Sequence, residues 1–409
     1  PGVDTMTPPV LAIIGAGSTG KAAALTAVAS GLEVHLFDRF PIDLPPTDGI
    51  RSHHWTAVWG LFAGPRVAAS CDDLPVILEP DAVLLAHGAT DPTVPFPGST
   101  LPGVITGTGI LTLLQRWHLL PARRFTIIGS GPRGQHVSEV LKHAGGEVSL
   151  MVDVSEIRSF EVTGRGQVEH ARLHGRTVET DMVVIALEPA PDLTFAAMAE
   201  CELTFDTQQS HWRVSRDSQC RTTNRQIWIA GGAAGAHASA DSAAEGAYAA
   251  AAIAASFLLV DTSAVERIRP TSIPEDSPGS QSAVSPGRVR QPWIPQSTAP
   301  IDMRAPRPAM AGDVNSSGRL CVCRCEEVTA AQIDAAITAG ASSLNDLKRR
   351  TRAGMGLCQG AYCLNVMAQM LSEALNIPLS DLTPMTLRPP VGGITLQALA
   401  ASSPALGPD

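Results

Sequence analysis

The sequence predicts an α/β protein with two nucleotide-binding units and a small, all-helical domain near the C-terminal end. Two glycine fingerprints, at 15–20 and 129–134, each follow a buried strand and open a helix. Five of the eight cysteines fall between 321 and 363, beyond a proline-rich stretch. Together these observations predict two similar Rossmann-like α/β lobes, followed by a separate helical unit that carries thiols.

The first unit has the full context of a dinucleotide-binding fold. The run VLAII leads into GAGSTG at 15–20, a helix-forming stretch ends at Gly31, and the strand LEVHLFD ends in Asp38. Glycines in such a turn let the backbone approach a pyrophosphate at a helix N-terminus, and the acid binds the adenosine ribose. A turn that needs glycine for its geometry alone is the alternative. The residues expected to bind this nucleotide are Gly15, Gly17, Ser18, Thr19, Gly20, Asp38, Arg39, Ala86, His87, Gly88, Gly231 and Gly232.

The second unit repeats this pattern. RRFTIIGSGPRG at 123–134 is a strand that enters the glycine turn, and the strand after the helix ends in Asp153. The unit is inserted before the return strand at 226–231, which is the layout of two-dinucleotide-domain flavoprotein reductases. Its candidate nucleotide-binding residues are Gly129, Gly131 and Gly134. A duplicated unit can also persist as a scaffold after losing its ligand, so both interpretations stay open.

Composition and charge exclude several classes of function. The 409 residues include 30 basic and 39 acidic side chains, so the net charge is −9, which disfavours binding to nucleic acid or anionic membranes. The longest apolar run, 247–260, is shorter than the roughly 20 residues of a transmembrane helix. The first ten residues lack the features of a secretory signal. We therefore expect a cytoplasmic protein, at most peripheral to the inner membrane through its electron acceptor, whose clustered cysteines bind metal instead of forming disulfides.

Proline, serine and glycine dominate the stretch from 262 to 318, which we interpret as an extended linker. Beyond it, Thr329 and Gln332 form a predicted capping box at the start of the helical unit. The expected domains are 1–118 and 206–261 for the first nucleotide-binding domain, 119–205 for the inserted second one, 262–318 for the linker, 319–376 for the cluster domain and 377–409 for a C-terminal tail.

The cysteines follow the pattern C-x-C … C-x4-C, with 32 residues between Cys325 and Cys358. Four thiolates at this spacing fit a tetrahedral-sulfur metal site, either an iron–sulfur cluster or zinc, although zinc sites more often use C-x2–4-C pairs on both sides. Cys363 stands at the start of a predicted helix, whose N–H groups stabilise negative charge.

The stretch VCRCEEVT … TRAGMGLCQGAYC resembles the [2Fe-2S] domain of the bacterioferritin-associated-ferredoxin (BFD) type. Together with the two fingerprints and VPFPGSTLPGVITG at 94–107, the chain resembles the α subunit of multi-subunit flavin-dependent amino-acid dehydrogenases and oxidases. That group includes opine oxidases, dye-linked proline and hydroxyproline dehydrogenases and hydrogen cyanide synthase, and sarcosine oxidase has a related subunit. The resemblance implies a two-dinucleotide-domain flavoprotein fold with a BFD-like all-α domain.

The resemblance also implies cofactors and partners. A D-amino-acid-oxidase-like β subunit would carry the FAD that oxidises the amine, FMN would lie at the interface, and a small γ subunit is an additional expected partner in the hetero-oligomer. The [2Fe-2S] ligands it implies are Cys323, Cys325, Cys358 and Cys363, with Cys321 outside the motif. It implies an electron-transfer subunit that relays electrons from the β-subunit flavin through FMN and the cluster to an acceptor. No catalytic residue is expected in this chain.

Two departures from the family pattern fall on the flavin side of the first unit. No Gly-Gly segment follows Asp38, and Gly232 stands where the return strand usually ends in aspartate. We therefore expect FAD, or ATP or NAD in the same site. A self-contained NAD(P)H-dependent FAD/[2Fe-2S] reductase and a non-catalytic scaffold or redox-sensing subunit are the alternative functions. The clustered His53, His54 and Trp55 are expected at a surface or interface.

Overall fold

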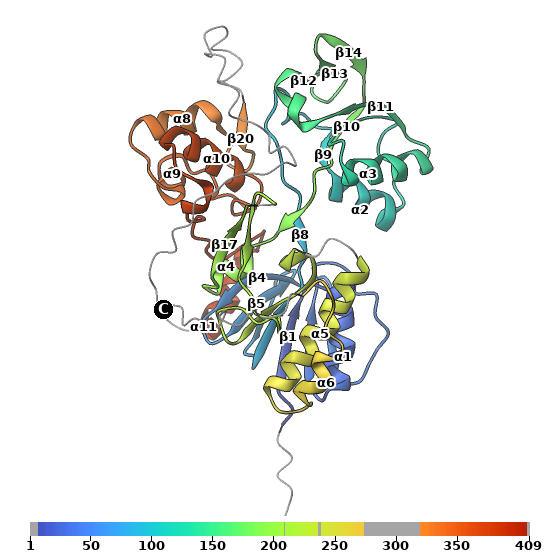
Figure 1. The fold of residues 1–409 in the computed structure, drawn as a ribbon, viewed down its shortest axis with the longest axis vertical. Helices are drawn as coiled ribbons and strands as arrows, with labels where there is room; N and C mark the ends of the chain where they lie inside the picture. The colour runs from blue at the N-terminus through green and yellow to red at the C-terminus, as the bar shows by residue number, and fades with distance from the viewer. Residues whose placement is uncertain (1–6, 208, 236–238, 274–319, 407–409) are drawn as a thin grey trace, which may run out of the picture.

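The computed structural model describes residues 7–207, 209–235, 239–273 and 320–406. It shows two α/β lobes, one below and one above, and a helical domain beside the upper lobe (Figure 1). Of the helices in these described residues, none is long and apolar enough to cross a membrane. The fold class is therefore as the sequence predicts, with corrections to the domain boundaries.

The first lobe is built on a parallel five-stranded sheet with the order β19-β7-β1-β2-β3. Its strands are β1 (Val10–Ile14), β2 (Glu33–Phe37), β3 (Ile50–His53), β7 (Ala82–Leu85) and β19 (Ile227–Ile229). Helices α1 (Ser18–Ala29) and α5 (Ser239–Ser256) pack together on one face, and the meander β4 (Ala57–Phe62), β5 (Arg66–Cys71) and β6 (Leu74–Leu78) lies on the other. The helices approach closely because both are rich in alanine, and a Cβ at Gly246 would lie 2.2 Å from the backbone oxygen of Thr19.

The second lobe repeats this plan with a four-stranded parallel sheet of order β11-β10-β15-β9. Its elements are β9 (Val104–Thr106), α2 (Gly107–Trp117), β10 (Arg124–Ile128), α3 (Pro132–His143), β11 (Glu147–Val152), the 3-10 helix η1 (Val154–Ser159), the antiparallel strands β12 (Phe160–Thr163), β13 (His170–Leu173) and β14 (Arg176–Glu179), and β15 (Met182–Ile185). The predicted start at residue 119 is wrong, because Ile105 in β9 pairs with Val184 in β15 and α2 covers the same sheet.

Two short antiparallel strands connect the lobes. They are β8 (Ala89–Thr90) and β16 (Ala190–Pro191), and the chain passes through them on its way up and down (Figure 1). The predicted boundary at 205/206 is also wrong, since it falls inside β17 (Leu203–Asp206) of the β17–β18 hairpin. We call the segment from β16 through α4 (Thr194–Met198) to the hairpin strand β18 (His211–Val214) the connector.

The C-terminal domain is small and mostly helical. It contains β20 (Cys321–Cys323), β21 (Val328–Thr329), α8 (Ala330–Thr338), α9 (Leu344–Thr351) and α10 (Leu364–Leu375). The predicted capping box of Thr329 and Gln332 is present at the start of α8. Trp212 from β18 is buried in the core of this domain, so the connector and the C-terminal domain share one packed interior.

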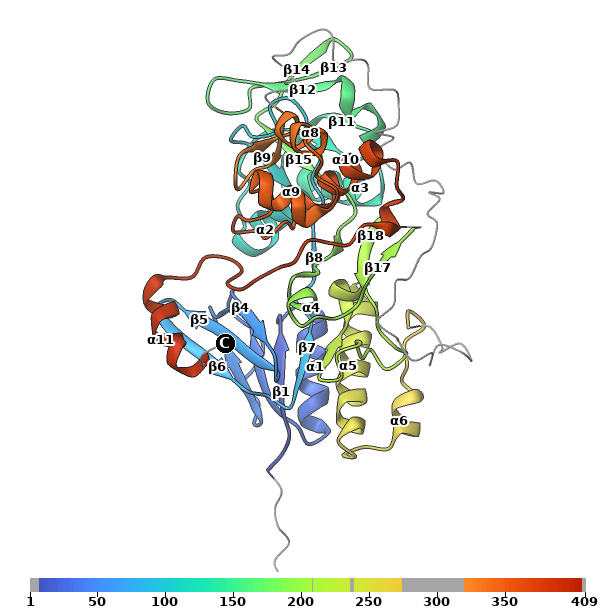
Figure 2. The ribbon, with the colours of Figure 1, turned by 90° about the vertical axis from the view of Figure 1, so that its left-hand side faces the viewer.

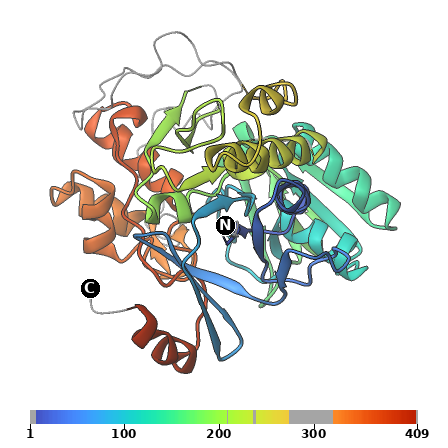
Figure 3. The ribbon, with the colours of Figure 1, turned by 90° about the horizontal axis from the view of Figure 1, so that it is seen from below.

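The linker and the tail need correction where the structure describes them. Residues 262–273 are folded: α6 (Thr262–Glu266) places Val265 in the first lobe's core, together with Ile273. Residues 274–318 of the expected linker lie outside the described residues. The expected tail crosses back to the first lobe, where α11 (Leu396–Leu406) packs beside β6 (Figures 2 and 3). On the way, the Val391 N–H donates to the Trp59 carbonyl at 2.8 Å.

Candidate metal centre and nucleotide sites

The four cysteines of the predicted cluster come together in the C-terminal domain as two pairs. The thiols of Cys323 and Cys363 are hydrogen bonded to each other, and both residues are 1% exposed. The thiols of Cys325 and Cys358 are likewise hydrogen bonded, but Cys325 is exposed and Cys358 is half-buried. In the part of the chain that the structure describes, no three metal-binding side chains converge on one ion. This arrangement fits a two-iron cluster with two thiolates on each iron, and it does not fit a closed, single-ion zinc site.

Glycines bring the second cysteine loop against the first. Gly354 has a φ of +84°, and its N–H donates to the Cys323 sulfur at 3.5 Å. A Cβ at Gly356 would lie 2.2 Å from the Cβ of Cys325, so only glycine allows this approach. Cys363 is the N-cap of α10, where unpaired N–H groups and the helix dipole stabilise a thiolate.

The thiol pKa values differ within the group. The hydrogen bond from Cys363 lowers the pKa of Cys323 to about 6, against the opposing effect of burial. The same hydrogen bond, together with burial, raises the pKa of Cys363, while burial raises the pKa of Cys358 to about 11. Because their pKa values are raised, Cys358 and Cys363 must release protons when they bind metal.

Cys321 stands outside both pairs. It lies on β20 opposite Thr329, and burial and the nearby Cys323 raise the pKa of its thiol. That position agrees with its exclusion from the motif.

The first glycine turn has the geometry that a pyrophosphate requires. Gly15 has a φ of +103°, and a Cβ there would lie 2.5 Å from the Ala86 carbonyl oxygen. A Cβ at Gly20 would lie 1.8 Å from the Gly15 oxygen, so this glycine is needed for the close packing of α1 on β1. By contrast, Gly17 faces open space and, like Ser18, is exposed at the start of the helix. Gly17 is therefore the position where a phosphate can approach the backbone.

Asp38 ends β2 beside this turn. Its carboxylate accepts hydrogen bonds from the N–H of Ala16 at 2.8 Å and the N–H of Phe40 at 2.9 Å. A carboxylate has about four acceptor positions, so Asp38 retains capacity for ribose hydroxyls. The segment after Asp38 contacts α2 of the second lobe, because the Arg116 guanidinium lies 4.2 Å from the Phe40 ring centroid. The Arg39 guanidinium lies 5.3 Å from the same centroid.

The other predicted residues of the first site line the facing loops. The Thr19 side chain is buried against Gly231. A Cβ added at Gly231 would lie 2.0 Å from the Thr19 hydroxyl, so this side chain packs against the return strand. His87 turns toward the connector, with Nε2 3.0 Å from the Asp192 carbonyl oxygen and its ring edge-on to Phe195. The loop that contains Ala86 and Gly88 lies next to the loop that contains Gly231 and Gly232. A Cβ added at Gly232 would lie 3.4 Å from the Gly88 Cα.

A buried ion pair holds the return strand, and sequence reasoning did not identify it. Glu245 on α5 accepts a hydrogen bond from the Gly231 N–H at 3.0 Å and pairs with Arg216 at 3.0 Å. The Glu245 side chain is only 1% exposed. The available signal was a charged residue in the otherwise uncharged, alanine-rich run from Ala243 to Ala255.

The expected surface position holds for His54 and Trp55, whereas His53 is only partly exposed and packs against the sheet. His53 lies on β3 beside β2, where its ring stacks on Phe37 at 4.3 Å and its Nε2 is 3.0 Å from His35 Nδ1. Burial lowers the pKa of His53 to about 4, so it is neutral at physiological pH. His54 and Trp55 are both exposed.

The second glycine turn has the same backbone geometry but different surroundings. A Cβ at Gly129 would lie 2.4 Å from the Ala186 oxygen, one at Gly134 1.8 Å from the Gly129 oxygen, and Gly131 faces open space. Here, however, Pro132 removes a backbone donor, and the Glu188 carboxylate accepts the Arg133 N–H at 2.9 Å.

The acid of the second unit is also engaged. Asp153 accepts hydrogen bonds from Ser130 and from Ser155, and it caps η1. The Ser130 hydrogen bond lowers the pKa of Asp153. Because both the phosphate position and the ribose acid are taken by side chains of this chain, the scaffold interpretation is favoured for the second lobe.

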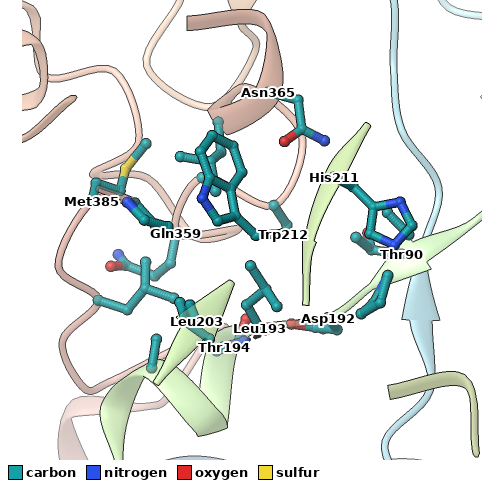
Figure 4. Close-up of a pocket in the computed structure, with 18 residues that line it drawn as sticks. Thr90, Asp192, Leu193, Thr194, Leu203, His211, Trp212, Gln359, Asn365 and Met385 are labelled. Carbon is teal, nitrogen blue, oxygen red and sulfur yellow. Dashed lines mark hydrogen bonds between the residues drawn. The ribbon is translucent and has the colours of Figure 1, made fainter. Parts of the chain in front are cut away.

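An open pocket lies between the connector and the second cysteine loop (Figure 4). Trp212, Leu203 and Met385 supply apolar lining, and Asp192, Gln359 and Asn365 supply polar groups. Beside it, the Thr93 hydroxyl donates to the Tyr362 carbonyl at 3.2 Å. These contacts hold the cysteine loop against the segments that lead into the first nucleotide site.

Comparisons with known proteins agree with this description. Residues 321–373 match the family described as BFD-like [2Fe-2S] binding domain. The A subunit of opine oxidase from Agrobacterium tumefaciens (strain Ach5) is 25% identical over 474 aligned residues, which cover 95% of this chain and 91% of that protein. The corresponding opine oxidase protein of Rhizobium meliloti is 24% identical over 417 residues, which cover 89% of this chain and 74% of that protein.

Among solved structures, L-proline dehydrogenase from P. horikoshii has a TM-score of 0.75 and 22% identity, covering 96% of this chain and 79% of that chain. The fold class is thereby confirmed, and so is the resemblance to the opine oxidase proteins, with a BFD-like C-terminal domain. The alignment with the Agrobacterium protein is longer than this chain's 409 residues, so that relative carries segments that this chain lacks.

Proposed function

We propose that the chain is the nucleotide-binding, electron-transfer subunit of a heteromeric flavin-dependent amino-acid dehydrogenase or oxidase. The observation that carries the proposal is the arrangement of four thiols in two contacting pairs, within a domain packed on the connector of a two-lobed nucleotide-binding body. The substrate would be an opine, proline, hydroxyproline, sarcosine or a similar amine. Its oxidation would occur on a D-amino-acid-oxidase-like β subunit.

The cluster ligands in this proposal are Cys323, Cys325, Cys358 and Cys363. When bound, the flavins accept a hydride from the amine, leaving an imine, and the cluster carries the electrons onward singly. The chain itself contributes the binding geometry: glycines at 354 and 356 admit the two loops to each other, and the N-terminus of α10 offsets thiolate charge.

The first lobe is the nucleotide site in this proposal, and FAD is the first choice, with ATP or NAD as alternatives. Its support is the exposed, open position of Gly17 and the remaining acceptor capacity of Asp38. Gly232, which stands where the family pattern has an aspartate, provides no carboxylate for contact with a flavin. FMN would lie at the interface with the partner subunit.

The self-contained NAD(P)H reductase is the second candidate. It requires a nicotinamide nucleotide on the second lobe, where Glu188 and Pro132 already alter the phosphate position. The proposal with a partner subunit is therefore favoured over it.

The test is to purify the chain with its native partners and identify three things: the co-purifying subunit, the nucleotides released on denaturation, and the iron bound per chain. We expect a flavin-binding partner, FAD or another adenine nucleotide in this chain, and two irons. Reduction of a dye by the amino acid should require the complex. An isolated chain that oxidises NADH with a dye would instead support the reductase, and full substrate-to-dye transfer after cluster removal would support the scaffold.

A further inference from the structure

Helix α2 contacts the first nucleotide site, although it belongs to the second lobe. It lies on the side of that lobe that faces the first one (Figures 1 and 2). Near its C-terminal end, the Arg116 guanidinium lies 4.2 Å from the Phe40 ring centroid, and its Nη2 donates a hydrogen bond to the Pro41 carbonyl at 3.0 Å. A cation over an aromatic ring is attracted to the electron-rich face, so Arg116 is joined to this loop by a cation–π contact and a hydrogen bond. The second lobe therefore holds the loop that directly follows Asp38.

Phe40 is one of the residues that orient the Asp38 carboxylate. Its N–H donates to Oδ1 at 2.9 Å, and the Ala16 N–H donates to Oδ2 at 2.8 Å. One oxygen is thus held from the glycine turn, and the other is held from the loop beneath Arg116. A carboxylate held at both oxygens is already oriented before a ligand arrives, so it loses less rotational freedom when it accepts hydrogen bonds from ribose hydroxyls.

The other end of α2 is anchored to the segment that joins the lobes. Asp91, which follows β8 and is 4% exposed, accepts hydrogen bonds from the Thr108 N–H at 2.7 Å and from the Thr108 hydroxyl at 2.8 Å. The Arg133 guanidinium donates to the same hydroxyl at 2.9 Å. Because α2 is fixed at its start, Arg116 near its end has a defined position over the first lobe.

The first lobe holds the same loop through its backbone. The Asp38 N–H donates to the His53 carbonyl at 3.2 Å, and the Trp55 N–H donates to the Phe40 carbonyl at 3.4 Å. These bonds do not involve Arg116, so the loop should stay folded when the guanidinium is removed. What Arg116 adds is a fixed position of the Phe40 ring, and with it the direction of the N–H that reaches Asp38.

We propose that Arg116 is a positioning residue for the first nucleotide site, which orients Asp38 toward the ribose hydroxyls of an adenine nucleotide by fixing Phe40. The inference rests on the proposed function, because it requires that the first lobe binds such a nucleotide. FAD, ATP and NAD share adenosine diphosphate, so the role is the same for each of them. The second lobe, whose own phosphate position is taken by Glu188, thereby contributes to binding in the first lobe.

The test measures the binding of ADP and of 2′,3′-dideoxy-ADP to the nucleotide-free full chain by calorimetry. Arg116→Ala should weaken ADP binding by about two- to fivefold, which is the range that a surface cation–π contact supplies. It should leave dideoxy-ADP binding unchanged, because that ligand lacks the hydroxyls that Asp38 would bind. Arg123→Ala, at another exposed arginine of the second lobe, is the control and should change neither affinity.

Two further variants place the effect at Asp38. Asp38→Asn should weaken ADP binding by about tenfold, as expected when a hydrogen bond to a charged group is lost, and should remove the preference for ADP over dideoxy-ADP. Arg116→Lys retains a cation but not the planar guanidinium, so its loss of ADP affinity should be smaller than that of Arg116→Ala.

The outcomes separate this inference from the proposed function. Equal ADP affinities of the wild type and Arg116→Ala would overturn the inference and leave the nucleotide site in place. Equal weakening of both ligands by Arg116→Ala would also overturn it, because a general disturbance of the lobe does not distinguish ADP from dideoxy-ADP. A wild-type chain that binds no ADP would count against the nucleotide site of the proposed function, and the inference would fail with it.

Discussion

The carboxylate of Glu188 accepts a hydrogen bond from the backbone N–H of Arg133 at 2.9 Å, in the first turn of α3. This is the place where a dinucleotide phosphate would bind in the second lobe. A side chain from the loop after β15 thus occupies the anion position of an otherwise intact glycine turn. The relationship explains how the lobe can keep its fingerprint without keeping a ligand.

Replacing Glu188 with Ala should make this position available to an anion. A carboxylate or phosphate at a helix N-terminus is worth about 0.3–1 kcal/mol, and up to about 2 kcal/mol when partly buried. We expect ADP to bind the variant up to about tenfold more tightly at the second lobe, measured by calorimetry on the nucleotide-loaded chain. The control is Glu147→Ala, which removes an exposed acid from the same lobe. Equal ADP binding by both variants would show that Glu188 does not block the site.

Gly17→Ala and Gly131→Ala form a matched pair. Both glycines are helix N-caps with nearly the same backbone angles, φ −70° and −72°, and an added methyl group meets nothing within 4 Å at either one. Neither change should lower the melting temperature much. If the first lobe alone holds nucleotide, Gly17→Ala should reduce the nucleotide bound per purified chain about tenfold, because the methyl group displaces the phosphate. Gly131→Ala should leave the nucleotide content unchanged, and the reverse result would assign the ligand to the second lobe.

Arg216→Ala should destabilise the first lobe strongly. It leaves the Glu245 carboxylate buried without its partner, which costs about 3–5 kcal/mol. The measurement is the free energy of unfolding in urea. Arg213→Ala is the control, because Arg213 is 57% exposed in its pair with Asp206 and should cost less than about 1 kcal/mol. Similar losses in both variants would contradict this role of the buried pair.

The same ion pair sets a pH dependence. Burial alone raises the pKa of Glu245, but the Arg216 hydrogen bond and charge outweigh it and lower the pKa below its usual 4.5. A lowered folded-state pKa adds stability above pH 4.5, and this stability is lost as the pH falls further, when Glu245 takes up a proton. Unfolding measured between pH 3 and pH 7 should therefore show a steeper acid-side loss for the wild type than for Glu245→Gln.

Trp212→Ala should loosen the C-terminal domain from the connector. Trp212 is 3% exposed and packs in the core of that domain, so its loss costs about 3–5 kcal/mol. Hydrogen exchange should increase in α8 and α10 and remain unchanged in β1 and β2. Trp117→Ala, at a tryptophan that is 50% exposed on α2, is the control and should leave exchange in α8 and α10 unaltered. Equal exchange in both variants would show that the domain is held independently of the connector.

Cys321→Ser should leave two irons per chain and an unchanged [2Fe-2S] absorption. Cys321 lies outside the two contacting thiol pairs, so its replacement removes no proposed ligand. Cys358→Ser, in contrast, should alter the absorption or lower the iron content. Loss of iron from Cys321→Ser would return this cysteine to the ligand set.

Local patterns predicted much of this molecule. The glycine turns, the strands that enter them, Asp38 and Asp153 at the strand ends, and the capping box of Thr329 are all where the spacing places them. Such features depend on residues within a few positions of one another, so a short stretch of sequence contains the physical information that specifies them. The boundaries at 119, 205/206 and 262 failed because they depend on strand pairing and packing between distant segments: β9 with β15, and Val265 with the first lobe's core.

The sequence by itself determined which chemistry this chain can perform: glycine turns that admit a phosphate, and four thiols at cluster spacing. The tertiary structure decided how those groups are used. Glu188 reaches the second turn from 55 residues away, and the contacting thiols pair across the two loops and not within them. Both outcomes arise from contacts between residues that are far apart in the chain. Such a contact spans only a few ångströms, so it forms only when the complete fold brings the two residues together.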